Sequence, residues 1–443
     1  MIDRDRLAAL RADEERQFVR LHPRSAELSG QAGGALLAGV PMPWMTRWPG
    51  SFPLFVDTAT GARLTDVDGV SYVDLCLGDT GAMTGHALPQ VTEAIAGRAA
   101  RGLTTMLPSS DAIWVARELA RRFGLPTWQL AMSATDANRF VLRFARHLTG
   151  RPRVAVMDWC YHGTVDETLA VLDDRGGVVP RPGALGPQVD VAETTAVVPF
   201  NDADALDRRL AQGDVACLLM EPALTNIGIV LPDPGYLEAV REITRRHGVL
   251  LVIDETHTLC AGPGGCTAAW GLEPDLLVVG KPIGGGVPVA AYGMTAAVAQ
   301  RLEGPMRGHE IDVAGVGGTL TGNALALAAV RATLSTCLRE EDFAVALPLA
   351  SRLTDGVAEV IERHRLPWHV QRLGCRAEYW FCPPPRDGAA AAAAVDEELE
   401  GFLHLWCLNR GVLLTPFHNM ALLSPHHTEV FAEAVAALIR AVA

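Results

Sequence analysis

The chain has 443 residues, 49% of them hydrophobic and 20% charged, which suits a large folded core and excludes a disordered protein. Its 51 acidic residues outnumber 38 basic ones, and the formal charge of -13 disfavours binding to nucleic acid or anionic membranes. The first 20 residues lack the apolar stretch of a secretory signal, and no apolar run approaches the roughly 20 residues of a membrane span. Nine cysteines without a CxxC pair fit reduced thiols rather than disulfides or a metal site. We therefore expect a cytoplasmic protein of two or three domains.

The predicted elements change character along the chain. Residues 1 to about 20 predict an amphipathic helix, and an irregular segment rich in Gly, Pro and Trp follows as far as residue 50. Short β-rich runs with Asp-Gly and Thr-Gly turns at 52–77 predict a small antiparallel sheet. Between about 88 and 330, helical stretches such as 90–101 and 111–123 alternate with apolar strands such as 154–157, 215–220 and 250–253. This alternation predicts a largely parallel sheet with helices on both faces.

The last third of the chain has a different pattern. It predicts long helices, a strand near 378–381 and a closing helix from Thr428. The alanine run at 389–394 follows three prolines and predicts a surface connection leading into a helix. We therefore expect an N-terminal segment at 1–80 that forms part of a small domain, a large α/β domain at 81–330, and a C-terminal small α+β domain at 331–443.

One residue count stands out. Of the 38 basic residues, 37 are arginine and only Lys281 is lysine. A general bias toward arginine explains the missing lysines but not the one that remains. Arginine keeps its proton in proteins, whereas a lysine amine can lose its proton and attack a carbonyl to form a Schiff base. Lys281 is therefore the first candidate catalytic residue, and chance survival at a neutral site is the alternative.

A carboxylate is expected close to this lysine. Lys281 follows the predicted strand 276–279 and precedes a glycine-rich turn, where a cofactor can approach closely. Asp254 ends the preceding predicted strand. Because ligands bind at the carboxyl ends of strands in open α/β sheets, both side chains should point into one crevice. A plain buried ion pair is the alternative.

Two further segments complete a pattern. Ser133 and Thr135 stand between an apolar segment and a helix, where hydroxyl and free N–H groups suit a phosphate, although a simple N-cap has the same residues. Tyr161 follows the strand at 154–157 and can stack on a flat ring or simply fill the core. A lysine, a carboxylate, a phosphate-suited helix start and an aromatic ring together match the needs of pyridoxal 5'-phosphate (PLP).

With these residues in place, the sequence resembles the class III aminotransferases, a family of fold type I PLP enzymes. Within this family it is most similar to the branch of glutamate-1-semialdehyde aminomutase and β-amino acid transaminases. The resemblance spans nearly the whole chain and implies a large domain with a mostly parallel seven-stranded sheet, plus a small α+β domain from both chain ends. The motifs that carry it are Ser133-Ala-Thr-Asp-Ala, Tyr161-His-Gly, Glu221-Pro, Asn226-Ile-Gly, Asp254-Glu-Thr-His-Thr, Gly280-Lys-Pro-Ile-Gly-Gly-Gly-Val-Pro and Gly318-Thr-Leu-Thr-Gly-Asn.

The resemblance also implies a role for each matching residue. Lys281 would carry the Schiff base and shuttle a proton between substrate and cofactor, and Asp254 would pair with the pyridine nitrogen. Tyr161 would cover one ring face, and Asn226 would lie near the phenolic oxygen. A homodimer with shared active sites is implied, because the residues expected to hold the phosphate are Ser133, Ala134 and Thr135 of one subunit and Thr319 of the other.

The sequence departs from the family pattern at several positions. Ala134 replaces the usual glycine, a small change that leaves the backbone amides in place. His257 stands where relatives often carry Gln, Met or Arg; it could touch the phenolic oxygen or be a polar filler. Trp44 falls where relatives that act on carboxylated substrates often carry arginine, with Arg47 three residues later. A larger or more apolar substrate is therefore possible, and both residues are candidate substrate contacts.

The predicted strand near 378 supplies two more candidate substrate residues. Arg376 and Glu378 share one face of it, because alternate residues of a strand point the same way. Such a pair is usually solvated on the surface. If this face lines the crevice, Arg376 could bind a carboxylate and Glu378 could select polar or cationic groups.

We consider three functions. The first is an aminotransferase that moves nitrogen from an amine or amino acid donor to a keto acceptor by ping-pong half-reactions through the lysine Schiff base. The second is a PLP-dependent isomerase, either an aminomutase or a racemase. The third is a protein that binds PLP without turnover, which the retained Lys281 and Asp254 argue against. A need for a second substrate separates the first from the second.

Overall fold

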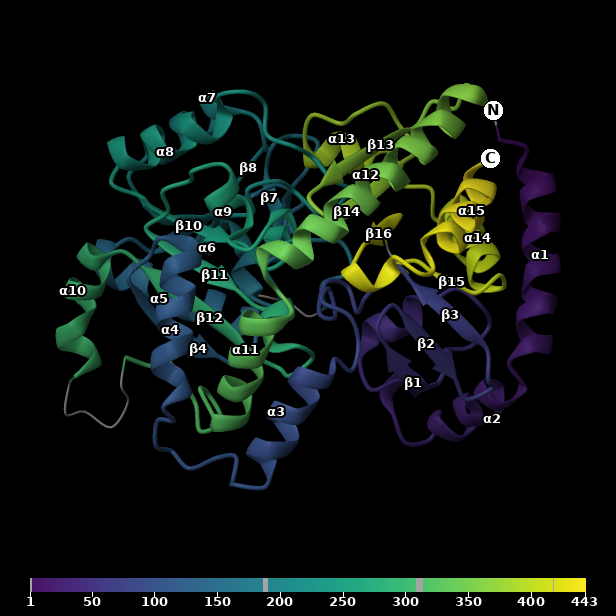
Figure 1. The fold of residues 1–443 in the computed structure, drawn as a ribbon. Helices are drawn as coiled ribbons and strands as arrows, with labels where there is room; N and C mark the ends of the chain where they lie inside the picture. Colours follow the sequence, from purple (N-terminus) through teal and green to yellow (C-terminus); the bar gives the residue numbers. More distant parts are fainter. Residues whose placement is uncertain (1, 186–189, 308–313, 417) are drawn as a thin grey trace. The chain divides into compact units, whose positions relative to one another are not determined.

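The computed structural model describes residues 2–185, 190–307, 314–416 and 418–443, and the chain forms two compact units in it (Figure 1). Unit 1 consists of Met1–Leu88, Glu341–Pro384 and Ala394–Ala443, and unit 2 of Pro89–Glu340 and Pro385–Ala393. Both main boundaries lie later than the expected 80/81 and 330/331. The first is later because the Gly61 N–H donates to the His86 carbonyl (2.9 Å), which keeps residues 81–88 with unit 1. The second is later because the helix at Ala324–Thr336 packs within unit 2.

Unit 2 is built on a seven-stranded sheet with the order β4-β12-β11-β10-β9-β5-β8. Only β12 runs antiparallel to its neighbours, so the sheet is mostly parallel, as expected. Strands β9, β11 and β12 are buried at every residue, which is why their sequences are continuous apolar runs rather than alternating ones. The strands are β4 (Thr127–Ala131), β5 (Arg153–Met157), β8 (Thr195–Val198), β9 (Val215–Met220), β10 (Leu250–Asp254), β11 (Leu276–Val279) and β12 (Ala290–Met294).

Helices pack against this sheet, and α5 (Ala134–Thr149) contacts β4, β9, β11 and β12 (Figure 1). It begins at Ser133, whose hydroxyl accepts the Asp136 N–H (3.2 Å), and ends at Gly150, which is left-handed at φ 68°. Its start therefore lies directly after strand β4. The other elements are α3 (Pro89–Ala99), α4 (Asp111–Phe123), α6 (Val191–Thr194), α7 (Ala203–Leu210), α8 (Tyr236–Arg246), α9 (Gly265–Ala269), α10 (Ala296–Met306), α11 (Ala324–Thr336) and the hairpin β6 (Ala170–Leu172) and β7 (Val178–Pro180).

Unit 1 joins the two ends of the chain in its sheets. The antiparallel strands β1 (Val56–Thr60), β2 (Arg63–Asp66) and β3 (Ser71–Asp74) are extended by β15 (Val412–Leu413), which pairs parallel to β3. A second sheet has the order β13 (His369–Leu373), β14 (Arg376–Trp380) and β16 (Met420–Leu422). The expected antiparallel sheet at 52–77 and the strand near 378–381 are thus present, with the strand beginning at Arg376.

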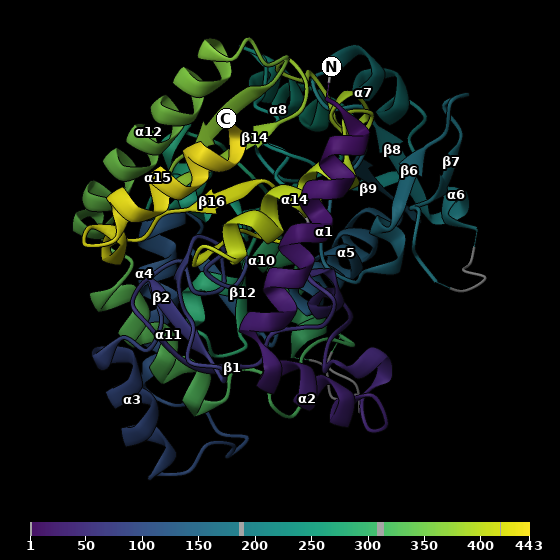
Figure 2. The ribbon, with the colours of Figure 1, turned by 90° about the vertical axis from the view of Figure 1, so that its right-hand side faces the viewer.

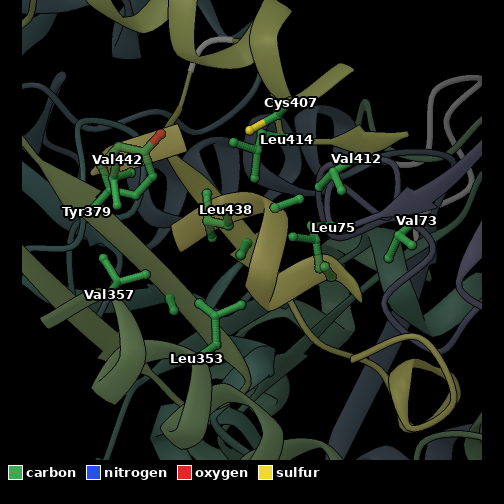
Figure 3. Close-up of a cluster of buried hydrophobic side chains, with 14 of the residues drawn as sticks. Val73, Leu75, Leu353, Val357, Tyr379, Cys407, Val412, Leu414, Leu438 and Val442 are labelled. Carbon is green, nitrogen blue, oxygen red and sulfur yellow. The ribbon is translucent and has the colours of Figure 1, made fainter. Parts of the chain in front are cut away.

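The helices of unit 1 are α1 (Arg4–Leu21), α2 (Pro23–Ala32), α12 (Glu340–Arg363), α14 (Glu397–Leu408) and α15 (Phe431–Val442). Figure 2 shows α14 between α1 and α15, and it contacts both. The core beneath them is a cluster of buried apolar side chains drawn from every part of the unit, including Val73, Leu75, Leu353, Val357, Cys407, Val412, Leu414 and Leu438 (Figure 3). Because the cluster mixes residues from both chain ends, neither end can form it alone.

The prediction for the alanine run is correct only in part: Ala389, Ala390 and Ala393 are exposed and α14 follows the run, but the run is not a loose connection. Residues 388–392 form the short helix α13 (Gly388–Ala392), in which Gly388 and Ala391 are buried, and the segment belongs to unit 2. A Cβ atom at Gly388 would lie 2.6 Å from the Asp158 carbonyl oxygen, so the helix sits tightly on the end of β5. Small side chains are needed there because the backbone approaches closely, not because the segment is a tolerated surface loop.

Two kinds of feature are absent from the described residues. None of their helices is both long and apolar enough to cross a membrane. Nowhere among them do three or more His, Cys, Asp or Glu side chains gather in a group that could hold a metal ion.

Candidate active site

Asp254 and Lys281 come from the ends of neighbouring parallel strands. Asp254 closes β10 and pairs in register with Val278 of β11, and Lys281 follows β11 after one glycine. The Lys281 backbone has φ 46°, in the left-handed region that few side chains other than glycine adopt without strain. A Cβ atom at Gly280 would lie 3.1 Å from Cβ of Ala134, so glycine lets the start of α5 approach the lysine turn. The sheet register therefore brings both predicted residues to one edge.

The Asp254 carboxylate is buried and well held. One oxygen accepts the Asn138 amide and the His162 Nδ1–H, each at 3.0 Å, and the other accepts the Thr256 N–H at 3.0 Å. Burial alone would raise the pKa of Asp254, but the bonds and charge of His162, with Thr256 and Asn138, outweigh it and lower that pKa to about 2. Asp254 is therefore ionised at neutral pH.

His162 is the counterpart of this carboxylate. Its burial works against the charged ring, yet the neighbouring Cys160 and the bond to Asp254 raise the pKa of His162 well above its usual value. Asn138 reaches the same site from the second turn of α5 and also donates to the His162 carbonyl at 3.1 Å. Neither residue was predicted to have a role, although His162 lies in the Tyr161-His-Gly motif and Asn138 directly follows the Ser133-Ala-Thr-Asp-Ala motif. The only signal was their polarity at positions that face a buried sheet.

The Lys281 amine lies beside a histidine. Its Nζ atom is 2.8 Å from Nε2 of His257, which is itself 8% exposed. His257 stands three residues after Asp254, in the turn that leaves β10. The structure thus places this unusual histidine on the lysine amine.

At the start of α5, the hydroxyl groups of Ser133 and Thr135 both accept hydrogen bonds from backbone N–H groups. Ser133 is exposed and caps the helix with its hydroxyl, and the Thr135 hydroxyl accepts the Thr164 N–H at 3.1 Å. Gly163 has φ 80°, and a Cβ atom there would lie 2.2 Å from Oγ1 of Thr135. The glycine of the Tyr-His-Gly segment is therefore required by its approach to α5.

The remaining predicted cofactor residues of unit 2 have these surroundings. The Arg181 guanidinium lies over one face of the Tyr161 ring, with 5.9 Å between Cζ and the ring centroid. Asn226 is half-buried in the loop that follows β9, and Thr319 is exposed. The last position agrees with a contact made to another subunit but does not test it.

The four candidate substrate residues all belong to unit 1. Trp44 is 42% exposed, and Arg47 lies 3.9 Å from the Glu397 carboxylate. Arg376 and Glu378 form an ion pair at 3.2 Å, and both are buried. The expectation of a solvated pair is therefore wrong. β14 is the central strand of its sheet, with β13 on one side and β16 on the other, and its opposite face, with Ala377 and Tyr379, packs into the apolar core.

More titratable groups surround this ion pair. His418 Nδ1 lies 3.4 Å from Glu378, and His404 Nε2 lies 3.3 Å from Oδ1 of Asn419. Burial, followed by the charge of Glu378, raises the pKa of Glu400 to about 7. Burial likewise lowers the pKa of His404 to about 4. We call these residues, Arg376, Glu378, Glu400, His404, His418 and Asn419, the unit 1 polar cluster.

The chain is similar to known enzymes over nearly its full length. A family model described as aminotransferase class-III matches residues 44–422. The glutamate-1-semialdehyde 2,1-aminomutase of Heliobacterium modesticaldum is 34% identical over 403 residues, which cover 89% of this chain and 90% of that protein. These aminomutases support the isomerase alternative better than the aminotransferase that the sequence analysis put first.

Solved structures give the same result. The crystal structure of a glutamate-1-semialdehyde-aminomutase from Pseudomonas aeruginosa PAO1 is 50% identical, with a TM-score of 0.97, and covers 100% of this chain and 98% of that one. A variant of that protein was solved in complex with PMP. The β-phenylalanine aminotransferase of Variovorax paradoxus is 26% identical, with a TM-score of 0.87, and covers 98% and 97% of the two chains. The chain therefore belongs to the class III aminotransferases, a family of fold type I enzymes whose cofactor is PLP.

Proposed function

We propose that the chain is an aminomutase, an isomerase that uses PLP to move an amino group between adjacent carbons of one molecule. The observation that carries this proposal is its similarity, over about nine-tenths of both chains, to proteins named glutamate-1-semialdehyde 2,1-aminomutase. The substrate class that follows is a small amino aldehyde that bears a carboxylate.

The residues of the site suit PLP in several respects. Ionised Asp254 suits a protonated pyridine nitrogen, and the free N–H groups at the start of α5 suit a phosphate. Gly280 lets the start of α5 lie close to the lysine turn, because a Cβ atom there would meet Cβ of Ala134 at 3.1 Å. The buried Thr256 hydroxyl, beside Asp254, has no hydrogen-bond partner among the described residues. These observations support PLP as the ligand of this site.

When bound, PLP supplies an aldehyde that condenses with amines and a ring that accepts electrons from the substrate carbon. The chain's own residues then have distinct tasks. Lys281 would hold the cofactor covalently and, as a free amine, would carry a proton between the substrate carbon and the cofactor. Asp254 would keep the ring nitrogen protonated, because His162 and Asn138 hold its charge in place.

The other assignments are proposals of the same kind. Tyr161 would cover one face of the cofactor ring, and Asn226 and His257 would lie near its phenolic oxygen. The Ser133-Ala134-Thr135 backbone would hold the phosphate. Thr319, which is exposed in a single chain, completes the phosphate site of a second copy, so we propose a homodimer. In unit 1, Trp44, Arg47, Arg376 and Glu378 remain the candidate substrate residues.

A second function, aminotransfer between two molecules, is favoured by one position. Trp44 stands where carboxylate-binding relatives often carry arginine, and an exposed indole cannot pair with a carboxylate as a guanidinium does. The cofactor residues do not separate the two functions, because both need the same lysine and aspartate.

Turnover on one substrate separates them. The purified enzyme with bound PLP is incubated with glutamate-1-semialdehyde alone, and products are identified by mass spectrometry. An aminomutase forms the isomer with nitrogen on the neighbouring carbon over many turnovers. If product formation stops at one equivalent per active site and resumes only when a keto acid is added, the enzyme is an aminotransferase.

A further inference from the structure

The contact between His257 and Lys281 points to a task that the family resemblance does not assign. Nε2 of His257 and Nζ of Lys281 are 2.8 Å apart, which is hydrogen-bond distance. Only one proton fits on the line between them, so either the amine donates to the ring or the ring donates to a neutral amine. The two groups therefore share a proton whenever the amine is free.

The turn that carries His257 is fixed from both ends. The Glu255 N–H donates to the Val278 carbonyl at 2.8 Å, which ties the turn to the strand that leads to Lys281. The buried Glu255 carboxylate accepts from Thr258, Cys266 and Thr267. A Cβ atom at Gly265 would lie 2.3 Å from Oε2 of Glu255, so the loop closes tightly on this carboxylate.

The lysine side of the contact is equally constrained. Lys281 sits in the left-handed backbone region, and the 3-10 turn Lys281–Gly284 begins with it. A strained backbone of this kind persists only where its surroundings hold it. The His257 ring and the Lys281 amine thus lie on turns at the ends of β10 and β11 that are held in place by their neighbours. The contact between them is therefore a fixed part of the site.

We propose that His257 is a positioning residue for Lys281, which holds the free amine through Nε2 and accepts the proton that the amine must lose before it reacts. In that transfer the Nζ–H bond breaks and an Nε2–H bond forms, so no further reactant is needed. The inference rests on the proposed function, because it gives Lys281 a reason to exist as a neutral amine. It differs from a contact to the cofactor's phenolic oxygen, since the partner is the amine itself.

Capture of the cofactor tests the proposal without turnover. Full-length chain freed of PLP is mixed with PLP, and the rise of visible absorption is followed. Because Lys281 is the only lysine, borohydride reduction and mass spectrometry report its reaction with PLP without interference from other lysines.

The variants have different expected capture rates. His257→Leu should slow capture about tenfold, which corresponds to the loss of one hydrogen bond of about 1.4 kcal/mol. His257→Gln, which keeps a hydrogen-bonding amide, should slow it less. His364→Leu, at an exposed histidine of unit 1, is the matched control.

A second readout separates positioning from a loss of structure. The turnover number is measured with substrate that carries deuterium at the reacting carbon. The isotope effect should grow in His257→Leu and His257→Gln, because proton transfer by Lys281 becomes slower relative to the other steps. A merely structural defect lowers the amount of active enzyme and leaves the isotope effect unchanged.

The outcomes are distinct. Wild-type capture rates and isotope effects in both His257 variants would overturn the proposal. If thermal melting shows that His257→Leu does not fold, the same two measurements on His257→Gln decide. Absence of a pyridoxyl mass on Lys281 in the wild-type chain would instead refute the proposed function, whatever the His257 variants do.

Discussion

The two units each bury a group of charged side chains, but they treat the charge differently. In unit 2, Asp254 accepts three hydrogen bonds from three separate parts of the chain, and its pKa falls to about 2. In unit 1, Glu400 lies in the polar cluster near Glu378, and its pKa rises to about 7, while the pKa of His404 falls to about 4. The first site preserves the charge of its carboxylate at neutral pH, whereas the second keeps the Arg376–Glu378 ion pair but disfavours charge on Glu400 and His404.

The difference follows from how each carboxyl group is satisfied. A buried carboxylate stays ionised only where enough donors and a cation offset its lost hydration. Asp254 has these partners, but Glu400 faces the negative charge of Glu378, already paired with Arg376. A cofactor that needs a fixed negative charge suits the first site. We therefore expect changes at Lys281 and Asp254 to affect turnover more than folding, and changes at Glu400 to do the opposite.

The largest effect is expected at Lys281. Lys281→Arg keeps the positive charge but removes an amine that can be deprotonated. Turnover should fall by at least about 10³-fold, and borohydride should fix no pyridoxyl mass on the chain. Circular dichroism should show unchanged folding. Retained activity in this variant would show that the Lys281 amine is not essential for turnover. The expected difference in function between the sites of the two units would then be lost.

Asp254→Asn tests directly whether turnover depends on the negative charge of Asp254. The amide has the shape of the carboxylate but no negative charge, so turnover should fall by about 10²- to 10³-fold while the fold remains. The folded pKa of Asp254 is depressed, so its contribution to stability is present above pH 3.8 and is lost as the pH falls toward 2. Denaturant unfolding of wild type should show this loss, and the variant should not. Equal acid sensitivity of the two proteins would contradict the assignment.

Gly163→Ala probes the packing that supports the site. Its Cβ atom would lie 2.2 Å from Oγ1 of Thr135, and φ is 80°, so we expect a loss of about 2–4 kcal/mol of unfolding free energy. Gly124→Ala is the matched control, since Gly124 has φ 73° and nothing within 4 Å of an added Cβ. It should lose about 1 kcal/mol from backbone strain alone. Equal melting temperatures for the two variants would show that the contact with α5 is loose.

The smallest effect is expected at Glu400. Its folded pKa is raised, so its contribution to stability is full below pH 4.5 and is lost as the pH rises toward 7. Glu400→Gln mimics the protonated form. The variant should match wild type near pH 4.5 and exceed it above pH 7 by about 1–3 kcal/mol of unfolding free energy. Turnover should change little. If the stability difference between the two proteins does not vary with pH, then the surroundings of Glu400 do not raise its pKa.

The sequence predicted the parts of the site that depend on strand ends. Asp254 and Lys281 could be placed together because parallel strands align their carboxyl ends, and β10 pairs with β11 as that argument requires. The partners of Asp254 could not be assigned in the same way. Asn138 and His162 lie 116 and 92 residues away along the chain, and only the sheet order brings them to one carboxylate.

Burial was the other property that sequence could not supply. Arg376 and Glu378 have the spacing of any two residues on one strand face, and the pattern does not say what covers that face. The alanine run raised the same difficulty, because small residues serve a loose connection and a tight helix contact equally well. In both cases the deciding neighbours come from other parts of the chain: His418 and Glu400 lie near the ion pair, and the end of β5 lies against the alanine run.

The pairing of β15 with β3 has a consequence for biosynthesis. Val73 finds its partner Val412 only after roughly 340 more residues have been made, which takes about 17–70 s at ordinary translation rates. During that time the outer edge of β3 lacks its native strand and presents free backbone groups to other chains. All residues of unit 2 have been made by then. The edge of β3 is therefore exposed to pairing with other chains for longer than unit 2 takes to be synthesised.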